Sequence, residues 1–181
     1  MHTPDREAYL DAVLVGGREA RAIVIADYDP AWPALYERER DRIAAALGTL
    51  PWAIEHVGST SVPGLAAKPI VDILVTVPDP DDEAAFAPSL SDAGFELRVR
   101  EPGHRMFRTP ERDVHVHVWR DGDDEARRQR LFRDQLRRSP EHRDAYERLK
   151  RGLTTREWQD MNEYADAKSG LITEILAAAE A

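Results

Sequence analysis

Hydrophobic and polar positions follow two different periods along this chain. Segments in which apolar side chains recur every three or four residues predict helices, at residues 5–14, 32–47, 79–93, 123–138, from Ser139-Pro140-Glu141 onward, and 155–179. Short runs of β-branched, aromatic and other apolar residues predict strands, at residues 22–26, 52–57, 70–77, 95–99, 105–109 and 113–119. The order of elements indicates an α+β fold, with a mixed or antiparallel sheet, flanking helices and a helical C-terminal part.

The length of the chain suits one hydrophobic core. It has 181 residues, and no internal repeat or low-complexity linker divides it. We therefore expect a single domain over residues 1–181, with its sheet at about residues 20–120 and its C-terminal helices at about residues 123–180.

One acidic residue interrupts an otherwise apolar strand. Asp72 lies within the run 70–77, and an unpaired charge in such a strand is costly to bury. Side chains alternate along a strand, so His115 and His117 share one face of the strand 113–119, opposite three valines. If the polar faces of the two strands coincide, these three side chains converge on one cleft. The pattern therefore predicts a catalytic and metal-binding group at these positions.

Simpler interpretations of the same residues remain open. Asp72 could be satisfied by backbone N–H groups, or by an arginine such as Arg105 or Arg108. A histidine on a strand is often a half-exposed sheet residue with no ligand. The spacing of His115 and His117 favours a shared role, because both imidazoles must face the same way.

A glycine-serine turn precedes the strand of Asp72. Gly58-Ser59-Thr60 follows an apolar strand, where glycine lets the backbone approach a ligand and successive N–H groups can hold an anion. Pro69 favours an extended conformation at Lys68 and leads directly into the strand of Asp72. We therefore expect a phosphate cradle at Gly58, Ser59 and Thr60, close to Asp72.

Charge is distributed unevenly along the chain. The net charge of −9 argues against general nucleic-acid binding, because phosphate backbones would be repelled. Residues 127–151 nevertheless carry ten basic side chains against four acidic ones. This segment is interpreted either as a solvated helix face or as one wall of a site for a small phosphorylated molecule.

The composition excludes further kinds of chemistry and indicates the cellular location. The chain contains no cysteine, which excludes disulfides, thiolate catalysis and cysteine-bound zinc. Its first residues include acids and form no long apolar core, and no later segment reaches the roughly 20 apolar residues of a membrane span. We expect a cytoplasmic protein without membrane contact.

Several longer motifs together resemble the GrpB-like family of the nucleotidyltransferase superfamily, which has the polymerase-beta-like fold. The longest is EHVGSTSVPGLAAKPIVDILV, and the likeness continues in YDPAWPALYERERDRI, VHVHV, LFRDQLRRSPEHRDAYERLK and YADAKSGLITEIL. The resemblance implies a nucleotidyltransferase-like fold over nearly the whole chain. It also implies a nucleotide or coenzyme context, because GrpB-like domains occur fused to dephospho-CoA kinases.

The resemblance implies roles for particular residues. In that superfamily a Gly-Ser pair contacts a nucleoside triphosphate, two carboxylates on the next strand hold divalent metal, and a later strand supplies a third. Gly58 and Ser59 match the pair, and Asp72 matches the first acid. Leu74 occupies the place of the second acid, and the third is left to Asp113, His115 or His117. One carboxylate with imidazoles suits a single magnesium, manganese or zinc ion better than two magnesium ions.

Two functions from different classes follow. The first is an enzyme that transfers a nucleotidyl or phosphoryl group from a nucleoside triphosphate to a small molecule, with Lys68, Arg133 and Lys168 neutralising phosphate charge. The alternative is a non-catalytic module that binds a nucleotide or coenzyme and has lost the two-carboxylate metal site, as Leu74 suggests. Hydrolysis by a nucleophilic histidine is a weaker third hypothesis, because only two histidines alternate and Trp119 follows them.

Overall fold

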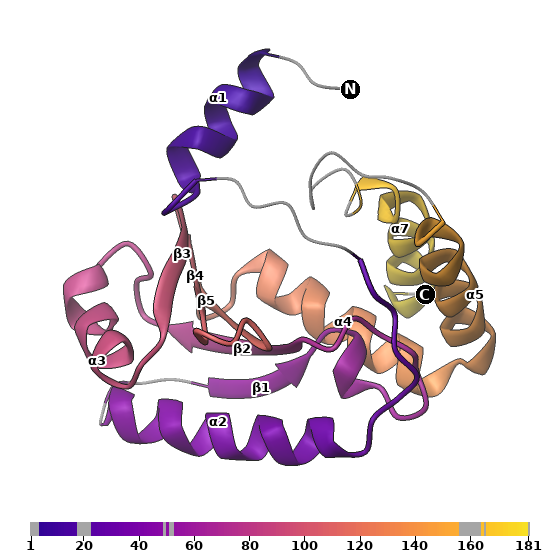
Figure 1. The fold of residues 1–181 in the computed structure, drawn as a ribbon, viewed down its shortest axis with the longest axis horizontal. Coiled ribbons are helices and arrows are strands. Elements are labelled where there is room, and N and C mark those ends of the chain that lie inside the picture. Colours follow the sequence, from indigo (N-terminus) through magenta and orange to yellow (C-terminus); the bar gives the residue numbers. More distant parts are fainter. Residues whose placement is uncertain are drawn as a thin grey trace.

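The computed structural model describes residues 4–17, 23–48, 50, 53–155, 164 and 166–180, with side chains from residue 8 onward. The helices are α1 (Pro4–Val13), α2 (Ala31–Leu47), α3 (Ala87–Asp92), α4 (Asp124–Arg138), α5 (Pro140–Leu153) and α7 (Ser169–Glu180), with short 3-10 turns η1 (Ser59–Ser61) and η2 (Glu83–Ala85). The strands are β1 (Ala53–Val57), β2 (Val71–Val77), β3 (Glu96–Glu101), β4 (His104–Arg108) and β5 (Val114–Arg120). Figure 1 shows α3 at one end of the sheet and α5 with α7 at the other.

The strands form one mixed sheet in the order β1-β2-β5-β4-β3. Strand β2 is antiparallel to β1 and parallel to β5, while β5, β4 and β3 are antiparallel neighbours. The parallel register sets Asp72 opposite His115 and Leu74 opposite His117. The predicted α+β fold with a mixed sheet is confirmed, and its central strand pair carries the polar residues singled out above.

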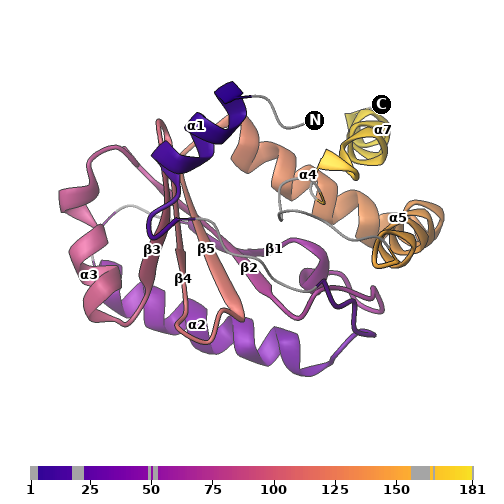
Figure 2. The same cartoon turned by 45° about the horizontal axis from the view of Figure 1, so that its top comes forward.

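The two faces of the sheet have different coverings. Alternation along β2 and β5 turns Val71, Ile73, Val114 and Val116 toward one face, where they pack under α2 and α3 to form the main core. The opposite face lies toward α4, whose Ala126 packs on Leu74. Figure 2 shows α2 and α4 on opposite sides of the sheet. The residues that share a face with Asp72 therefore lie between the sheet and the C-terminal helices.

The C-terminal helices begin at side-chain caps that the sequence makes recognisable. Asp123 accepts a hydrogen bond from the backbone N–H of Glu125, and Ser139 accepts one from that of His142. These helices bury a second apolar cluster against the turn that follows β1, formed by Val62, Leu65, Leu136, Tyr146 and Ile175. This cluster holds the helices beside the glycine-serine turn.

The predicted strand at residues 22–26 is wrong for the part that the structure describes. Ala26 forms an isolated bridge with Ala67, with N–O distances of 2.8 and 2.9 Å. Ile23, Val24 and Ile25 are not part of a strand, and Val24 is exposed. Residue 22 lies outside the described residues. An apolar run becomes a strand only where a neighbouring strand offers an edge, which a single sequence does not reveal.

Two predicted helices are shorter than expected. The segment 79–93 contains a turn and η2 before α3 begins at Ala87, because Pro88 lacks an N–H and fits the first turn of a helix but not its middle. The segment 155–179 is interrupted by a turn at Ala167 and Lys168, and α7 begins at Ser169. Residues 156–163 and 165 of that prediction lie outside the described residues. Among the described helices, none is long and apolar enough to cross a membrane.

Candidate functional site

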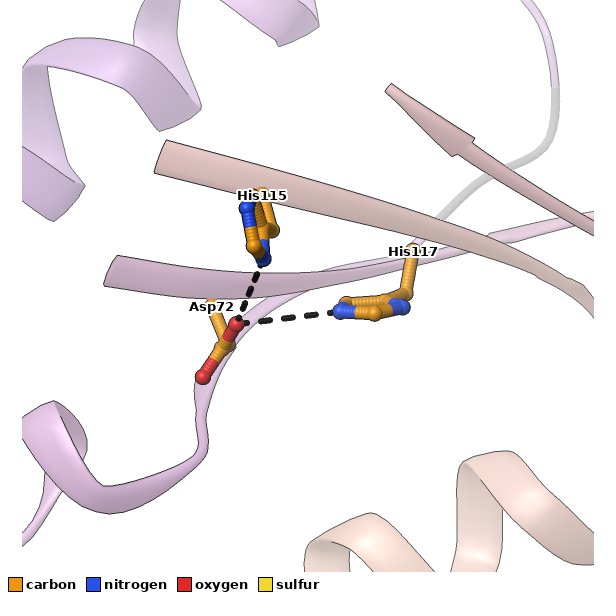
Figure 3. Close-up of side chains that lie close together, drawn as sticks. All are labelled: Asp72, His115 and His117. Carbon is orange, nitrogen blue, oxygen red and sulfur yellow. Dashed lines mark ion pairs between the residues drawn. The ribbon is translucent and has the colours of Figure 1, made fainter. Parts of the chain in front are cut away.

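Asp72, His115 and His117 meet on the face of the sheet that lies toward α4. The Nδ1 of His115 is 3.6 Å from Asp72 Oδ1, and the Nε2 of His117 is 3.7 Å from the same oxygen. Figure 3 shows both imidazoles directed at this carboxylate. The side chain of Asp72 is 31% exposed, that of His115 26% and that of His117 23%, so solvent and small solutes can reach them. The structure thus brings together the three residues that the strand pattern places on one face.

The arrangement fits a single metal ion. The three donor atoms lie within 4.8 Å of one another. Two donors bound tetrahedrally to one zinc ion at about 2.1 Å each lie about 3.4 Å apart, close to the 3.6 and 3.7 Å that separate the imidazole nitrogens from Asp72 Oδ1. One carboxylate with two imidazoles is a donor set for manganese, iron or zinc. It does not fit two magnesium ions, because Leu74 is fully buried against Ala126 and brings no second carboxylate.

The side chains beside Asp72 keep its carboxylate ionised. Burial raises the pKa of this carboxyl, but the two imidazoles beside it lower the pKa by more than burial raises it. The net pKa lies far below its ordinary value. Arg105 instead forms an ion pair with Glu83 at 2.6 Å, and Arg108 lies 3.6 Å from Glu96. The carboxylate is therefore ionised and faces imidazoles.

A cavity of about 170 Å³ opens beside Asp72 and His115, and we call it the lysine cavity. It is bounded by the glycine-serine turn, by β2 and β5, and by residues of the C-terminal part; its lining residues are Gly58, Ser59, Lys68, Ile70, Asp72, His115, Phe132, Tyr146, Lys150, Tyr164 and Lys168. Lys68 and Lys168 lie over the Tyr164 ring, 5.1 and 4.5 Å from its centroid. Three ammonium groups converge here, which makes the cavity suited to an anion.

The lysines repel one another in this confined space. Burial lowers the pKa of Lys150 to about 7, with the charge of Lys168 adding to the effect. Burial also lowers the pKa of Lys168 to about 8, assisted by the charge of Lys68 and opposed by Asp72. An anion in the cavity would relieve this repulsion and favour the protonated amines.

A second cavity of about 200 Å³ shares Gly58, Asp72 and Phe132 with the lysine cavity. Its lining residues are Val57, Gly58, Asp72, His117, Gln129 and Phe132. The two cavities share Asp72, while His115 lines the first and His117 the second. No lysine or arginine is among the described residues that line the second cavity. In the part of the chain described, Gln129 Oε1 is buried without a hydrogen-bond partner.

The residues of the predicted phosphate cradle are placed differently from one another. Gly58 and Ser59 line the lysine cavity, as do Lys68 and Lys168. Thr60 is buried, and its hydroxyl donates to the carbonyl of Ile70 at 3.2 Å. Since that hydroxyl has only one proton, it accepts at its 3.1 Å contact with His56 Nε2. Thr60 therefore stabilises the turn through its hydrogen bonds to Ile70 and His56.

Arg133 does not line either cavity. Its guanidinium donates to Glu55 at 2.9 Å, to Asp134 at 2.8 Å and to the carbonyl of His56 at 3.2 Å. These contacts hold the end of β1 that leads into Gly58. The structure does not bring Arg133 into the lysine cavity.

Sequence reasoning missed five residues of the lysine cavity, namely Ile70, Phe132, Tyr146, Lys150 and Tyr164. A usable signal was present in α5, where Tyr146, Lys150 and Leu153 follow helical spacing and are all buried. A lysine inside an apolar stripe must reach a polar partner. Lys150 donates to the carbonyl of Ala66. The same spacing of four links Tyr164 to Lys168.

Comparison with known proteins gives the relationship of the chain. The GrpB protein family matches residues 22–178. The chain belongs to the GrpB family. This GrpB-family chain is 52% identical over 168 residues to a UPF0157 protein of Streptomyces coelicolor, covering 93% of the chain and 90% of that relative. It is 45% identical to a UPF0157 protein of Halalkalibacterium halodurans, covering 99% and 94% respectively.

A solved GrpB structure has the same fold. The crystal structure of conserved protein GrpB from Enterococcus faecalis is 32% identical, with a TM-score of 0.76, and the match covers 86% of this GrpB-family chain and 96% of that one. A dephospho-CoA kinase of Mycolicibacterium paratuberculosis is 28% identical over 169 residues, which is 77% of this chain and 42% of the kinase. The predicted membership of the nucleotidyltransferase-like GrpB family is confirmed.

Gly58 of this GrpB-family chain allows Asp72 to approach the backbone. A Cβ at this position would lie 2.4 Å from Asp72 Oδ2, and the φ of Gly58 is +68°. The ψ of Gly58 is −172°, a combination that essentially only glycine adopts, so Gly58→Ala should lower the free energy of unfolding by about 2 to 4 kcal/mol through backbone strain and overpacking. Urea denaturation measures the change.

Gly64→Ala is the matched control for that variant. Gly64 also has a positive φ, +78°, but no atom within 4 Å of the added Cβ. It should lose only the strain of about 1 to 2 kcal/mol. Equal losses in the two variants would contradict the close approach of Asp72 to Gly58.

Proposed function

We propose that this chain is a metal-dependent transferase that moves a nucleotidyl or phosphoryl group from a nucleoside triphosphate to a small molecule. One observation carries the proposal: Asp72 and His115, two of three candidate metal ligands, line the same cavity as three lysines. Metal ligands beside converging ammonium groups are the parts that phosphoryl transfer requires. The whole chain, residues 1–181, would act as one unit, because sheet and C-terminal residues line the cavity together. We expect it to act in the cytoplasm.

The phosphates of the donor would occupy the lysine cavity. Lys68, Lys150 and Lys168 would neutralise their charge, while the backbone at Gly58 and Ser59 gives them close access. The ammonium groups would also stabilise the phosphate that leaves, since charge accumulates on it as its bond to the transferred group breaks. These residues supply binding and orientation.

Asp72, His115 and His117 would hold one divalent ion, with manganese or zinc favoured by the imidazoles and magnesium less so. When bound, the ion supplies a Lewis acid that polarises a phosphoryl oxygen. Where Asp72 and only one of the two histidines hold the ion, the other imidazole can take up the proton of the acceptor. Tyr146 and Phe132, which also line the lysine cavity, pack edge to face at 5.1 Å.

The acceptor would enter through the second cavity. That cavity meets the lysine cavity at Asp72, and its described lining carries no lysine or arginine to hold an anion. Gln129 Oε1 can accept a hydrogen bond there from a hydroxyl or amino group. This division favours an acceptor without negative charge.

The alternative function is a non-catalytic module that binds a nucleotide or coenzyme. It is supported by Leu74, which is buried where related proteins are expected to carry a second metal-binding acid. Similarity to a dephospho-CoA kinase supports a phosphorylated small molecule as ligand for either function.

Turnover separates the two functions. With Mn²⁺ and a panel of nucleoside triphosphates and small alcohols or amines, we expect ³¹P NMR to show transfer products that disappear when EDTA is added. The control is the same mixture without protein. Nucleotide binding that persists in EDTA, without any product, would reject the transferase in favour of the module.

A further inference from the structure

The lysines of this chain are gathered at one place in the fold. The chain has 25 lysines and arginines in total, and Lys68, Lys150 and Lys168 are the only lysines among them. All three line the lysine cavity, although they come from segments far apart in the sequence. An arginine keeps its proton in any protein environment, whereas a lysine can lose its proton when it is buried. The cavity is thus lined with cations that can give up their charge.

Lys150 is the only one of the three lysines that is buried, with 3% of the residue exposed. It lies on the apolar stripe of α5, where its Nζ is 4.8 Å from the centroid of the Tyr146 ring. Burial raises the pKa of the Tyr146 hydroxyl, so this neighbour carries no charge. The Nζ of Lys150 donates to the carbonyl of Ala66. A neutral amine makes this hydrogen bond with one N–H and keeps its lone pair available.

The surroundings of Lys150 favour the neutral amine. Burial lowers its pKa most, and the positive charges of Lys168, Arg151 and Lys68 lower it further, to about 7. Glu147 raises the pKa, but its carboxylate also accepts from Arg151 at 2.9 Å. About half of the Lys150 side chains are therefore neutral at pH 7, against fewer than about one in a thousand for an ordinary lysine.

We propose that Lys150 is a nucleophilic amine that forms an imine with a small phosphorylated aldehyde bound in the lysine cavity. Lys68 and Lys168 hold the phosphate, since both ammonium groups lie over the ring of Tyr164 and both residues line the cavity. A buried lysine beside other cations is a recurring form of amine nucleophile. The reaction needs neither a metal ion nor a nucleotide, so it goes beyond the proposed transfer and does not depend on it.

The volume of the cavity limits the size of the aldehyde. Cavities that hold drug-sized ligands measure roughly 300 to 1,000 Å³, whereas the lysine cavity measures about 170 Å³. The rings of Phe132 and Tyr146 also line it and offer apolar contact to carbon atoms. The cavity therefore favours a phosphate ester of a short-chain aldehyde.

Imine formation at Lys150 balances without another reagent. The lone pair of the amine attacks the carbonyl carbon, and the electron pair of the C=O bond moves to the oxygen, which takes one proton from the nitrogen. The resulting hydroxyl group leaves with the second proton of the amine as one water molecule, while the C=N bond forms. Nothing is oxidised or reduced.

Borohydride trapping in the parent protein tests the inference. The protein is incubated at pH 7 with glycolaldehyde phosphate and EDTA, borohydride reduces the imine to a stable secondary amine, and peptide mass spectrometry locates the adduct. We expect the adduct on Lys150. Its yield should exceed that from unphosphorylated glycolaldehyde by at least about 10-fold, because hydrogen bonds from ammonium groups hold the phosphate.

Two variants of α5 sharpen the test. Lys150→Arg keeps the positive charge and removes the nucleophile, so the adduct should be lost. Arg148→Lys is the matched control, because it adds a lysine at an exposed position of the same helix. The lysine introduced there should be labelled at least about 10-fold less than Lys150, since far less of it is neutral at pH 7.

An adduct mainly on Lys68 or Lys168, or no adduct on any lysine, would overturn the inference. Equal labelling by the two aldehydes would also overturn it, because phosphate would then play no part. If Lys150→Arg does not fold, the peptide map of the parent still decides which lysine reacts. Because EDTA is present throughout, the outcome is independent of the ³¹P NMR test of transfer.

Discussion

Asp72→Asn is expected to weaken Mn²⁺ binding by more than about 100-fold, because loss of an outer-shell partner alone costs about 10- to 100-fold and this change removes a direct ligand. Since the pKa of Asp72 lies far below its ordinary value, the carboxylate is ionised at every working pH. Asparagine keeps its size and removes the whole charge. Turnover of a nucleoside triphosphate should fall by at least as large a factor, measured by steady-state assay beside calorimetric metal titration.

Asp113→Asn controls for the loss of a nearby carboxylate. Asp113 immediately precedes β5, but its Oδ1 accepts from Thr109 at 2.7 Å, and it is not among the residues grouped with Asp72. This variant should bind Mn²⁺ as the parent does. If Asp72→Asn retained the parent's Mn²⁺ affinity, Asp72 would not be a ligand.

Binding of a non-hydrolysable ATP analogue should weaken as pH rises. The pKa values of Lys150 and Lys168 in the free protein are about 7 and about 8, and phosphate charge raises both on binding. Because phosphates are fully ionised above about pH 7, proton loss from the two lysines dominates. We expect a fall in affinity on the order of 100-fold between about pH 7.5 and 9, measured by calorimetry.

Unfolding is excluded as the cause of that fall by the sign of the same pKa shifts. The pKa of Lys150 is lower in the folded chain than its ordinary 10.5, so between these values the unfolded chain binds more protons. Its contribution to stability therefore rises with pH across this window. Thermal denaturation should show no loss of stability from Lys150 while affinity decreases.

Two methionine variants test the assignment to the cavity. Lys150→Met should weaken nucleotide binding at pH 7.5. It should also reduce the fall in affinity between about pH 7.5 and 9 to about 10-fold, since only Lys168 then titrates. Arg148→Met removes a positive charge from an exposed position of the same helix and should behave as the parent. An affinity that stays constant with pH in the parent would contradict the placement of phosphate among the lysines.

The sequence predicted the strands of the site well, for a physical reason. Strand β5 alternates buried and half-buried residues, and Asp72 is the one residue of β2 that is not buried, so the facing of Asp72, His115 and His117 could be inferred without coordinates. Their meeting could not be inferred, because it depends on parallel pairing in one particular register. The prediction became specific only through the resemblance to the GrpB family.

The remaining parts of the site depend on contacts between distant segments. Lys150 is one of ten basic residues in the segment 127–151, and only its burial distinguishes it from exposed neighbours such as Arg148. His104 lies just outside the strand predicted at residues 105–109, and its contact with His117 arises from the hairpin register. Arg133 had the expected charge, but Glu55 and Asp134 engage it away from the cavities.

The parallel pairing of β2 with β5 also bears on assembly of the protein. These strands are joined by α3 and a complete hairpin, so they can meet only after a long loop has closed, which is a slow event in folding. An ion shared by Asp72 and the two histidines would link β2 to β5. It would bind the folded chain alone, and would thereby add to its resistance to denaturation.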